Sequence, residues 1–287
     1  MTSQITGHTG LYALLGSPVA HSISPMMHNE AFRLLGIDAV YLAFDVGTDH
    51  FAQAVNGLRQ VNIKGFNVTM PNKNLMAELA DELSPAARLG GAVNTVVNDN
   101  GRLIGHTTDG IGYMMAAKDA GVELKGKTMT LLGAGGAATA IVVQAALDGM
   151  KEIRVFNLKD GFYDRICKIA EQLNKETDCR VTVSDLADMA ALKDSVQTSD
   201  ILTNCTNVGM APNTDACPIH DTGIFRPSLI VSDIIYNPAQ TMLLKKAKAC
   251  GCRTFNGMYM LLYQGAASFR LWTGKDMPVT QIKAKFF

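Results

Sequence analysis

The sequence predicts an α/β fold with two domains. Strand-like and helix-like stretches alternate along all 287 residues, a pattern typical of parallel sheets covered by helices. Hydrophobic residues make up 47% of the chain and charged residues 18%, which favours a sizeable core and argues against disorder. At about 150 residues per domain, this length corresponds to roughly two domains.

Charge and cysteine content narrow the class of protein. The 26 Lys and Arg residues balance the 26 Asp and Glu residues, so nucleic-acid binding is not expected as the main role. The six cysteines form no CxxC pair, which argues against a zinc site. Residues 1–10 show no signal peptide, and no apolar run reaches about 18 residues. We expect a cytoplasmic protein with reduced thiols and no metal or membrane partner.

Apolar runs and turn residues predict the elements of the first domain. A helix is expected over 25–35, with Ser24 as its N-cap and Gly36 as its end. The residues 98–101, Asn-Asp-Asn-Gly, predict a hairpin turn between two strands. Two further helices are expected, at 49–59 and 74–83. Strands are expected at 11–15, 41–46, 65–70, 92–98 and 103–106.

A shift in composition near Gly110 predicts the start of a second domain. We therefore expect a first domain over 1–109 and a second over 110–256, with C-terminal helices at 257–287 packing back on the first. Strands are expected at 127–132, 152–157, 180–184, 201–204, 229–235 and 253–256. Helices are expected at 110–121, from the loop at 133–138 to about 150, and at 186–197, 241–250 and 257–273.

A glycine-rich loop follows the first strand of the second domain. Residues 133–138 read Gly-x-Gly-x-x-Ala, with a strand before and a helix after them. Gly133 suits the tight turn, Gly135 lets the backbone approach a pyrophosphate, and the helix start offers N–H groups to an anion. The pattern predicts a Rossmann-type doubly wound parallel sheet that binds a dinucleotide; an ordinary glycine-rich turn is the alternative.

The end of the second strand of such a domain reads the adenosine ribose. Here Asn157 ends the strand, and Lys159 and Asp160 follow. A carboxylate accepts from a ribose 2′-hydroxyl and repels a 2′-phosphate, whereas a basic residue does the reverse. Asp160 therefore favours NAD, Lys159 keeps NADP open, and a solvated turn is the alternative role for Asp160.

Polar residues follow the expected elements of the first domain, where ligands of open α/β sheets bind. The clearest candidate among them is Lys73. Oxidation of a secondary alcohol needs a proton acceptor, and a neutral lysine is favoured by burial or by a helix start and disfavoured by a carboxylate such as Asp109. A solvated lysine at a helix start is the alternative. The other polar groups are Ser22, Ser24, Asn67, Thr69 and Asn94.

Taken together, these motifs resemble the shikimate dehydrogenase family. The resemblance runs from about residue 10 to about 275. It is closest to the quinate/shikimate dehydrogenase branch, through Met70-Pro71-Asn72-Lys73 and the segments 132–137 and 271–276. The matching motifs lie at 16–25, 67–73, 91–95, 108–110, 133–138, 204–210, 233–238 and 257–266.

The resemblance implies an N-terminal α/β substrate domain and an NAD(P)-binding Rossmann-type domain. It implies an oxidoreductase that interconverts shikimate with 3-dehydroshikimate and quinate with 3-dehydroquinate, with Lys73 as proton acceptor and Asp109 as its partner. The implied substrate residues are Ser22, Ser24, Tyr41, Asn67, Thr69, Lys73, Asn94, Asp109 and Gln264. The implied cofactor residues are Gly133, Ala134, Gly135, Gly136, Ala137, Asn157, Lys159, Asp160, Thr206, Asn207, Ile234, Ile235, Tyr236, Asn237 and Gly257.

Some residues depart from the family pattern. Thr107 replaces the usual Asn, and Leu158 stands where NADP-using members carry an arginine that clamps the phosphate. We therefore expect NAD to be preferred and NADP to remain usable. The Ser22-x-Ser24 pair resembles shikimate users, so quinate is expected at a lower rate. Alternatives are an NADP-specific biosynthetic enzyme and a non-catalytic sensor of NAD or a metabolite. A homodimer is the assembly considered.

Overall fold

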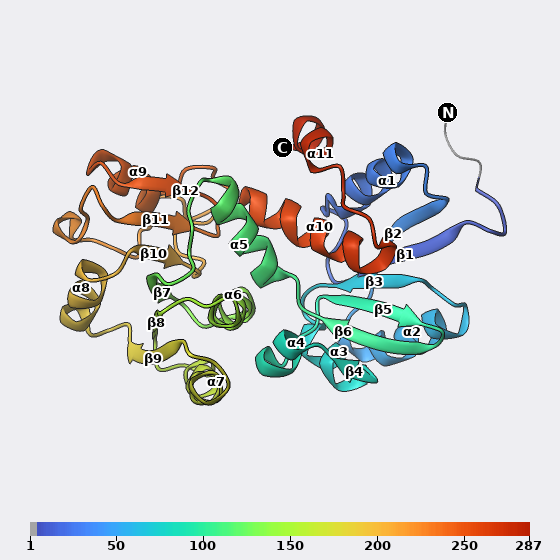
Figure 1. Cartoon of the computed structure of the whole chain (residues 1–287), viewed down its shortest axis with the longest axis horizontal. Coiled ribbons are helices and arrows are strands. Elements are labelled where there is room, and N and C mark those ends of the chain that lie inside the picture. Colours follow the sequence, from blue (N-terminus) through green and yellow to red (C-terminus); the bar gives the residue numbers. More distant parts are fainter. Residues whose placement is uncertain (1–4) are drawn as a thin grey trace. The chain divides into compact units, whose positions relative to one another are not determined.

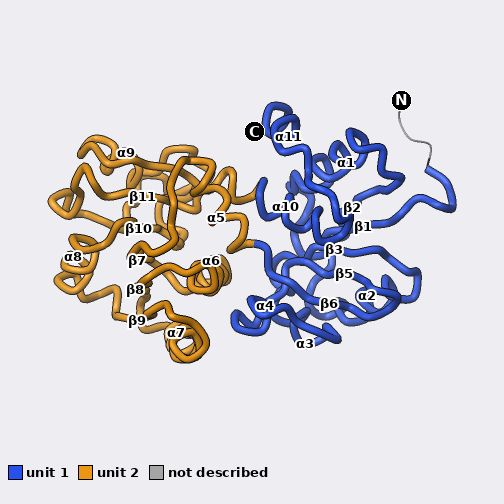
Figure 2. Tube along the Cα trace, viewed as in Figure 1, with its two compact units in different colours: residues 1–108, 262–287 blue, residues 109–261 orange. Residues whose placement is uncertain are grey.

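The structure is a computed structural model that describes residues 5–287. It divides into two compact units, shown in Figure 2: unit 1 holds the described residues up to Thr108 together with Leu262–Phe287, and unit 2 holds Asp109–Leu261. No helix in the described range is long and apolar enough to cross a membrane. The expectation of no signal peptide falls partly on residues 1–4, outside the described range.

Unit 1 is built on a six-stranded mixed sheet (Figure 1). Its strands are β1 (Gly10–Gly16), β2 (Ala39–Asp45), β3 (Gly65–Val68), β4 (Glu82–Leu83), β5 (Thr95–Asp99) and β6 (Arg102–His106). Its helices are α1 (Ser24–Leu35), α2 (Thr48–Gln60), α3 (Lys73–Leu79), α4 (Pro85–Gly90) and α11 (Val279–Phe286). The strand order is β2-β1-β3-β5-β6-β4.

The register of unit 1 brings several strand ends to one edge. β1 and β3 run parallel, whereas β5 is antiparallel to both β3 and β6. Thr95, the first residue of β5, pairs with Asn67 near the end of β3 and with His106 at the end of β6. The carboxyl ends of β1, β3 and β6 and the amino end of β5 therefore share one edge, called here the polar edge of unit 1.

Unit 2 holds a fully parallel six-stranded sheet in the order β12-β11-β10-β7-β8-β9. Its strands are β7 (Thr128–Leu132), β8 (Glu152–Asn157), β9 (Arg180–Asp185), β10 (Ile201–Asn204), β11 (Ile230–Asp233) and β12 (Arg253–Phe255). Its helices are α5 (Asp109–Asp119), α6 (Gly136–Leu147), α7 (Tyr163–Glu176), α8 (Met189–Gln197), the 3₁₀ turn η1 (Thr222–Ile224) and α9 (Met242–Ala249). From β7 the chain adds β8 and β9 on one side and then β10, β11 and β12 on the other, which confirms the predicted doubly wound arrangement.

One long helix supplies residues to both units. α10 (Met258–Thr273) gives its first four residues to unit 2 and the rest to unit 1. In unit 1, Phe269 is fully buried, and Trp272 donates from Nε1 to the carbonyl of Val96 on β5 at 2.9 Å. The aromatic core of unit 1 therefore depends on residues that follow unit 2 in the chain.

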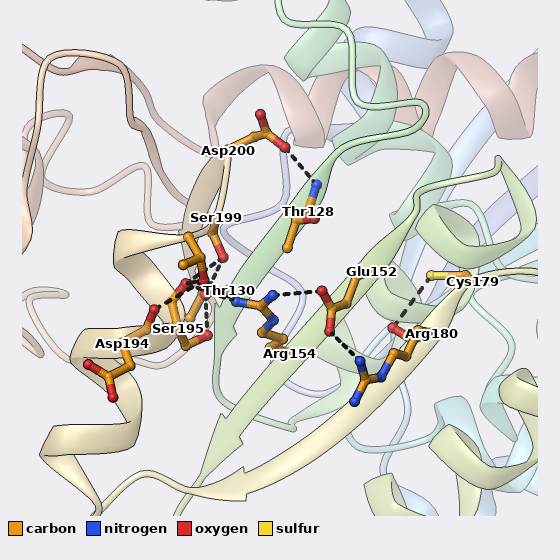
Figure 3. Close-up of polar contacts among 11 residues, drawn as sticks. Thr128, Thr130, Glu152, Arg154, Cys179, Arg180, Asp194, Ser195, Ser199 and Asp200 are labelled. Atoms are coloured by element: carbon orange, nitrogen blue, oxygen red, sulfur yellow. Dashed lines mark hydrogen bonds and ion pairs between the residues drawn. The ribbon is translucent and has the colours of Figure 1, made fainter.

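Hydrogen bonds between buried hydroxyl groups connect α8 and the residues after it to the sheet of unit 2 (Figure 3). The hydroxyl of Thr130 on β7 lies 2.7 Å from that of Ser195 and 2.7 Å from that of Ser199. Arg154 on β8 donates to Glu152 at 2.7 Å and to Thr198 at 2.6 Å. Since Glu152 begins β8, this network extends toward the amino-terminal side of the sheet, opposite the edge where such folds bind ligands.

Three element predictions were wrong in detail. α1 begins at Ser24 itself, with Ile23 as its N-cap, so Ser24 is not the cap; Gly36 ends the helix at a φ of 62° as predicted. The helix predicted over 74–83 ends at Leu79, because residues 82–83 form strand β4 and pair in parallel with β6 instead of continuing the helix. Strand β3 is shorter than its predicted range, and the helices α4 and α7 were not predicted.

Candidate active site

Two buried asparagines form the centre of the polar edge of unit 1. Asn67 and Asn94 are 5% and 3% exposed. The amide nitrogen of Asn67 donates to the carbonyl of Asn94 and to the hydroxyl of Thr95, both at 3.0 Å. The side-chain oxygen of Asn94 accepts from the backbone N–H of Thr108 at 2.8 Å. The structure thus joins two of the predicted substrate residues in one hydrogen-bonded group.

Tyr41 fixes the orientation of the Asn67 amide. Its hydroxyl donates to Oδ1 of Asn67 at 2.8 Å and is also hydrogen-bonded to the side chain of Ser24. Complete burial raises the pKa of Tyr41 well above its usual value, so the phenol stays a donor at neutral pH. Asn67 therefore presents its oxygen to β2 and its nitrogen to β5.

Helix α10, near the end of the sequence, adds two side chains to this hydrogen-bonded group. The amide nitrogen of Asn94 lies 3.5 Å from Oε1 of Gln264. The hydroxyl of Ser268, one turn further on, lies 3.1 Å from the Asn67 amide nitrogen and 2.7 Å from the Thr95 hydroxyl. Sequence reasoning missed Ser268, whose only signal was its spacing of one helical turn from Gln264.

Three partly exposed residues stand in the segments that follow β1 and β3. Ser22 accepts from the backbone N–H of Ser24 at 3.2 Å. The N–H of Thr69 donates to the carbonyl of Leu15 on β1 at 2.9 Å. Lys73 begins α3, and its carbonyl accepts from Val93 at 2.9 Å. Since Val93 directly precedes Asn94, Lys73 belongs to the same edge as the buried asparagines.

Asp109 is the first residue of α5 in unit 2 and is partly exposed. The next residue, Gly110, packs against α6: a Cβ there would lie 2.3 Å from the carbonyl oxygen of Ala140. This contact allows no larger side chain, so the start of α5 is set closely against the helix that follows the glycine loop.

The glycine loop has the geometry that a bound diphosphate requires. Gly133 has a φ of 100°, and a Cβ there would meet the backbone of Cys205 at 3.1 Å. Gly135 is the N-cap of α6 and offers no side chain to its N–H groups, and a Cβ on Gly135 or Gly136 would meet no atom within 4 Å. Ala134 is buried and Ala137 partly buried. The open, uncapped helix start therefore fits the pyrophosphate of NAD(P).

The turn after β8 is held by Asp160. Its Oδ1 accepts from Nδ2 of Asn157 and from the N–H of Phe162, each at 2.9 Å. Lys159 is exposed, and its ammonium lies 3.8 Å from a carboxylate oxygen of Asp185 at the end of β9. Asn157 and Asp160 are therefore in contact, while the basic residue of the turn is directed to a neighbouring strand.

Two buried side chains tie together the ends of β10 and β11. Asn204 accepts from the hydroxyl of Thr206 at 2.7 Å and donates to Asp233 at 3.1 Å. Asp233 also accepts from Thr241 at 2.7 Å and from the N–H of Ile235 at 3.0 Å. Burial raises the pKa of Asp233 to about 6 despite these donors. Sequence reasoning assigned no role to Asn204 or Asp233, although both lie within matching motifs.

The remaining predicted cofactor residues follow these two strands. A Cβ on Gly257 would lie 1.8 Å from the carbonyl oxygen of Ile234, and the Gly257 N–H donates to Ile235 at 3.2 Å. Tyr236 is 50% exposed, and Asn207 and Asn237 are exposed. At the carboxyl ends of β10 and β11, the backbone is therefore tightly packed, while the side chains of Asn207, Tyr236 and Asn237 are exposed to solvent.

Comparisons with known proteins cover the whole chain. A family model for the shikimate dehydrogenase substrate binding domain matches residues 14–96, and one for the shikimate 5'-dehydrogenase C-terminal domain matches residues 257–285. A protein of Listeria monocytogenes named shikimate dehydrogenase (NADP(+)) is 52% identical over 100% of this chain and 99% of its own length. A quinate/shikimate dehydrogenase of Escherichia coli is 48% identical over 97% of each.

A solved structure is similarly close. The crystal structure of a shikimate 5-dehydrogenase from Listeria monocytogenes, in complex with shikimate and NAD, superposes with a TM-score of 0.97. Its sequence is 52% identical to this chain, and the match covers 100% of this chain and 99% of that one.

Proposed function

The chain belongs to the shikimate dehydrogenase family, and from this premise we propose that it interconverts shikimate and 3-dehydroshikimate with NAD(P) and accepts quinate at a lower rate. Membership makes it an oxidoreductase that acts on a secondary alcohol, which argues against the alternative of a non-catalytic sensor.

The observation that carries the proposal is the hydrogen-bonded group at the polar edge of unit 1. Asn67, Asn94 and Gln264 present amides there, beside the partly exposed Thr69 and Lys73. Amide and hydroxyl groups recognise ring hydroxyls, and a lysine beside them supplies a group that can accept a hydroxyl proton. The substrate set is proposed as Ser22, Ser24, Tyr41, Asn67, Thr69, Lys73, Asn94, Asp109 and Gln264.

For the mechanism, we propose Lys73 as the acceptor of the hydroxyl proton. The partly exposed position of Lys73 at the start of α3 allows its ammonium to exchange that proton with water between turnovers. Asp109 would hold the lysine and one substrate hydroxyl in place. Bound NAD(P)⁺ would supply the hydride acceptor.

The cofactor would be held by unit 2, and the substrate by unit 1 together with Asp109, the one proposed substrate residue that unit 2 supplies. Support comes from the open start of α6 and from the strand ends beside it. The proposed residues are Gly133, Ala134, Gly135, Gly136, Ala137, Asn157, Lys159, Asp160, Thr206, Asn207, Ile234, Ile235, Tyr236, Asn237 and Gly257. A cytoplasmic location and a homodimer stay predictions from the sequence.

Within this function, NAD is proposed as the preferred cofactor. Asp160 is held at the end of β8, and the charge of Lys159 is paired with Asp185, so the turn favours a ribose hydroxyl over a phosphate. The relative named as NADP(+)-dependent supports the second candidate, an NADP-specific biosynthetic enzyme.

The deciding experiment is steady-state oxidation of shikimate and of quinate, each with NAD and with NADP. We expect the highest kcat/KM for shikimate with NAD. Lys73→Ala should lower kcat by about 10²–10⁴-fold, the usual contribution of a general base. Near-full activity of that variant would refute the role of Lys73, and absence of turnover with both acids would refute the function.

The cofactor preference has its own test. Asp160→Asn keeps an acceptor for Asn157 and Phe162 but removes the charge, so the NADP to NAD ratio of kcat/KM should rise about tenfold. Asp178, exposed before the amino end of β9 at the opposite sheet edge, offers Asp178→Asn as the control with an unchanged ratio. An unchanged ratio in Asp160→Asn would favour the NADP-specific candidate.

A further inference from the structure

Ser268 is the meeting point of four polar groups in unit 1. It is fully buried on α10, and its hydroxyl lies 2.7 Å from that of Thr95, 3.1 Å from the Asn67 amide nitrogen and 3.2 Å from the Thr108 hydroxyl. It also lies 3.0 Å from the carbonyl oxygen of Gln264, one turn earlier. These partners come from β3, β5, the segment after β6, and α10 itself.

The number of protons decides how these contacts are used. A hydroxyl has one proton and two lone pairs. The Gln264 carbonyl can only accept, so the proton of Ser268 goes there, as in other helical serines that bond back one turn. The lone pairs of Ser268 then accept from the Asn67 amide and from a threonine hydroxyl. Ser268 thus connects the backbone of Gln264 with the side chain of Asn67.

The Asn67 amide is consequently held at both ends. Its oxygen accepts from Tyr41 at 2.8 Å. Its nitrogen has two protons and three acceptors in range, namely the Asn94 carbonyl, Thr95 and Ser268. Loss of the serine hydroxyl would leave two acceptors for the two amide protons, so Asn67 would keep its hydrogen bonds within the sheet but would lose the contact that ties it to α10.

We propose that Ser268 is a positioning residue of the substrate site, holding the Asn67 amide and the α10 turn of Gln264 in place without contacting the substrate. This inference rests on the proposed function, since Asn67 and Gln264 are assigned there as substrate residues. Ser268 contributes to specificity through the placement of two amides that come from opposite ends of the chain.

The test is Ser268→Ala in the full-length protein, assayed with NAD. We expect the KM for shikimate to rise roughly tenfold, the equivalent of one hydrogen bond, with a smaller change in kcat. The Kd for shikimate, measured by calorimetry, should rise in parallel. The Kd for NADH, measured by fluorescence, should stay within about twofold, because the residues proposed to bind the cofactor lie in unit 2.

Ser195→Ala is a closely matched control. Ser195 is a buried helical serine whose hydroxyl lies 2.7 Å from Thr130 on a strand, as that of Ser268 lies 2.7 Å from Thr95 (Figure 3 shows the Ser195 contact). Ser195→Ala should lower the melting temperature about as much as Ser268→Ala does, but should leave the KM and the Kd for shikimate unchanged. An equal rise in KM in the two variants would reduce Ser268 to a purely structural role and overturn the proposal.

A double-mutant cycle tests whether Ser268 acts on substrate binding through Asn67. Tyr41→Phe removes the hydroxyl that holds the oxygen of Asn67, so its effect on KM should not multiply with that of Ser268→Ala. Fully independent effects would contradict action through Asn67. If Ser268→Ala does not fold, Ser268→Cys, of similar size and a weak acceptor, should raise KM in the same way. A wild type that oxidises shikimate while neither variant changes KM would refute this inference alone.

Discussion

Asp233 shows how a buried ionisable residue makes the stability of unit 2 depend on pH. Its carboxylate accepts hydrogen bonds from Asn204, Ile235 and Thr241, which belong to three different segments. The side chain is 1% exposed, and the cost of burying its charge outweighs these donors, so its pKa rises to about 6. Burial, and next the charge of Asp233, also raise the pKa of the nearby Cys205 thiol. This thiol therefore adds no charge at neutral pH.

The predicted consequence concerns Asp233→Asn. Between about pH 4 and pH 6 the folded protein keeps this proton while the unfolded chain releases it, so this group lowers the wild-type free energy of unfolding as pH rises. Relative to wild type, the variant should therefore gain about 3 kcal/mol between pH 4 and pH 7. Urea unfolding across this range measures the difference.

Asp221 provides the opposite case as a control. The N–H of Gly223 and the side chain of Lys193 lower the pKa of this exposed carboxyl. Asp221→Asn should therefore lose stability relative to wild type as pH rises through the acid range. A pH-independent difference for Asp233→Asn would show that Asp233 titrates normally.

At the scale of elements, the contact between α5 and α6 sets the position of Asp109. Gly110 leaves no room for a Cβ against Ala140, and Gln144 of α6 lies on the same side. Two helices approach this closely only where one of them lacks a side chain. The first turn of α5 is therefore packed directly against the middle of α6.

Gly110→Ala should separate these helices. We expect the free energy of unfolding to fall by about 1–3 kcal/mol from overpacking, and kcat to fall because Asp109 is displaced. Thermal unfolding and steady-state kinetics measure the two effects. Gly57→Ala is the control: this glycine of α2 has no atom within 4 Å of a Cβ, so the change should be neutral or stabilising. Unchanged kcat in Gly110→Ala would separate Asp109 from this contact.

Elements with a local signal could be predicted from the sequence, and those that depend on distant partners could not. The hairpin turn follows from Asn100 and Gly101, which both adopt a positive φ. The end of α3 could not be seen, because β4 forms only by pairing with β6. Likewise Asn67 and Asn94 were recognised by motif, whereas Ser268 matters through contacts with residues more than a hundred positions away.

At the scale of the whole molecule, the two units differ in how they use the chain. Unit 2 is one continuous stretch, Asp109–Leu261 (Figure 2). Unit 1 is discontinuous, and its core includes Phe269 and the Trp272 contact to Val96 from beyond unit 2. Burial of large aromatic side chains contributes several kcal/mol, so unit 1 depends strongly on its second segment.

Fragments test this difference. Residues 109–261 expressed alone should fold cooperatively and bind NADH, as measured by circular dichroism and fluorescence. Residues 5–108 alone should lack a cooperative transition and should not bind shikimate, because the aromatic residues and Ser268 of α10 are missing. A folded 5–108 fragment would show that the sheet of unit 1 is stable without α10.

The split of unit 1 also sets an order of events on the ribosome. Residues 5–108 are translated before unit 2, whereas the part of α10 that carries Phe269 and Trp272 is translated after it. During the synthesis of about 150 intervening residues, which takes about ten seconds at typical elongation rates, the nascent sheet lacks its contacts with α10. Unit 2 can fold during this interval and unit 1 last, so the apolar residues of unit 1 that pack on α10 are the last to be buried.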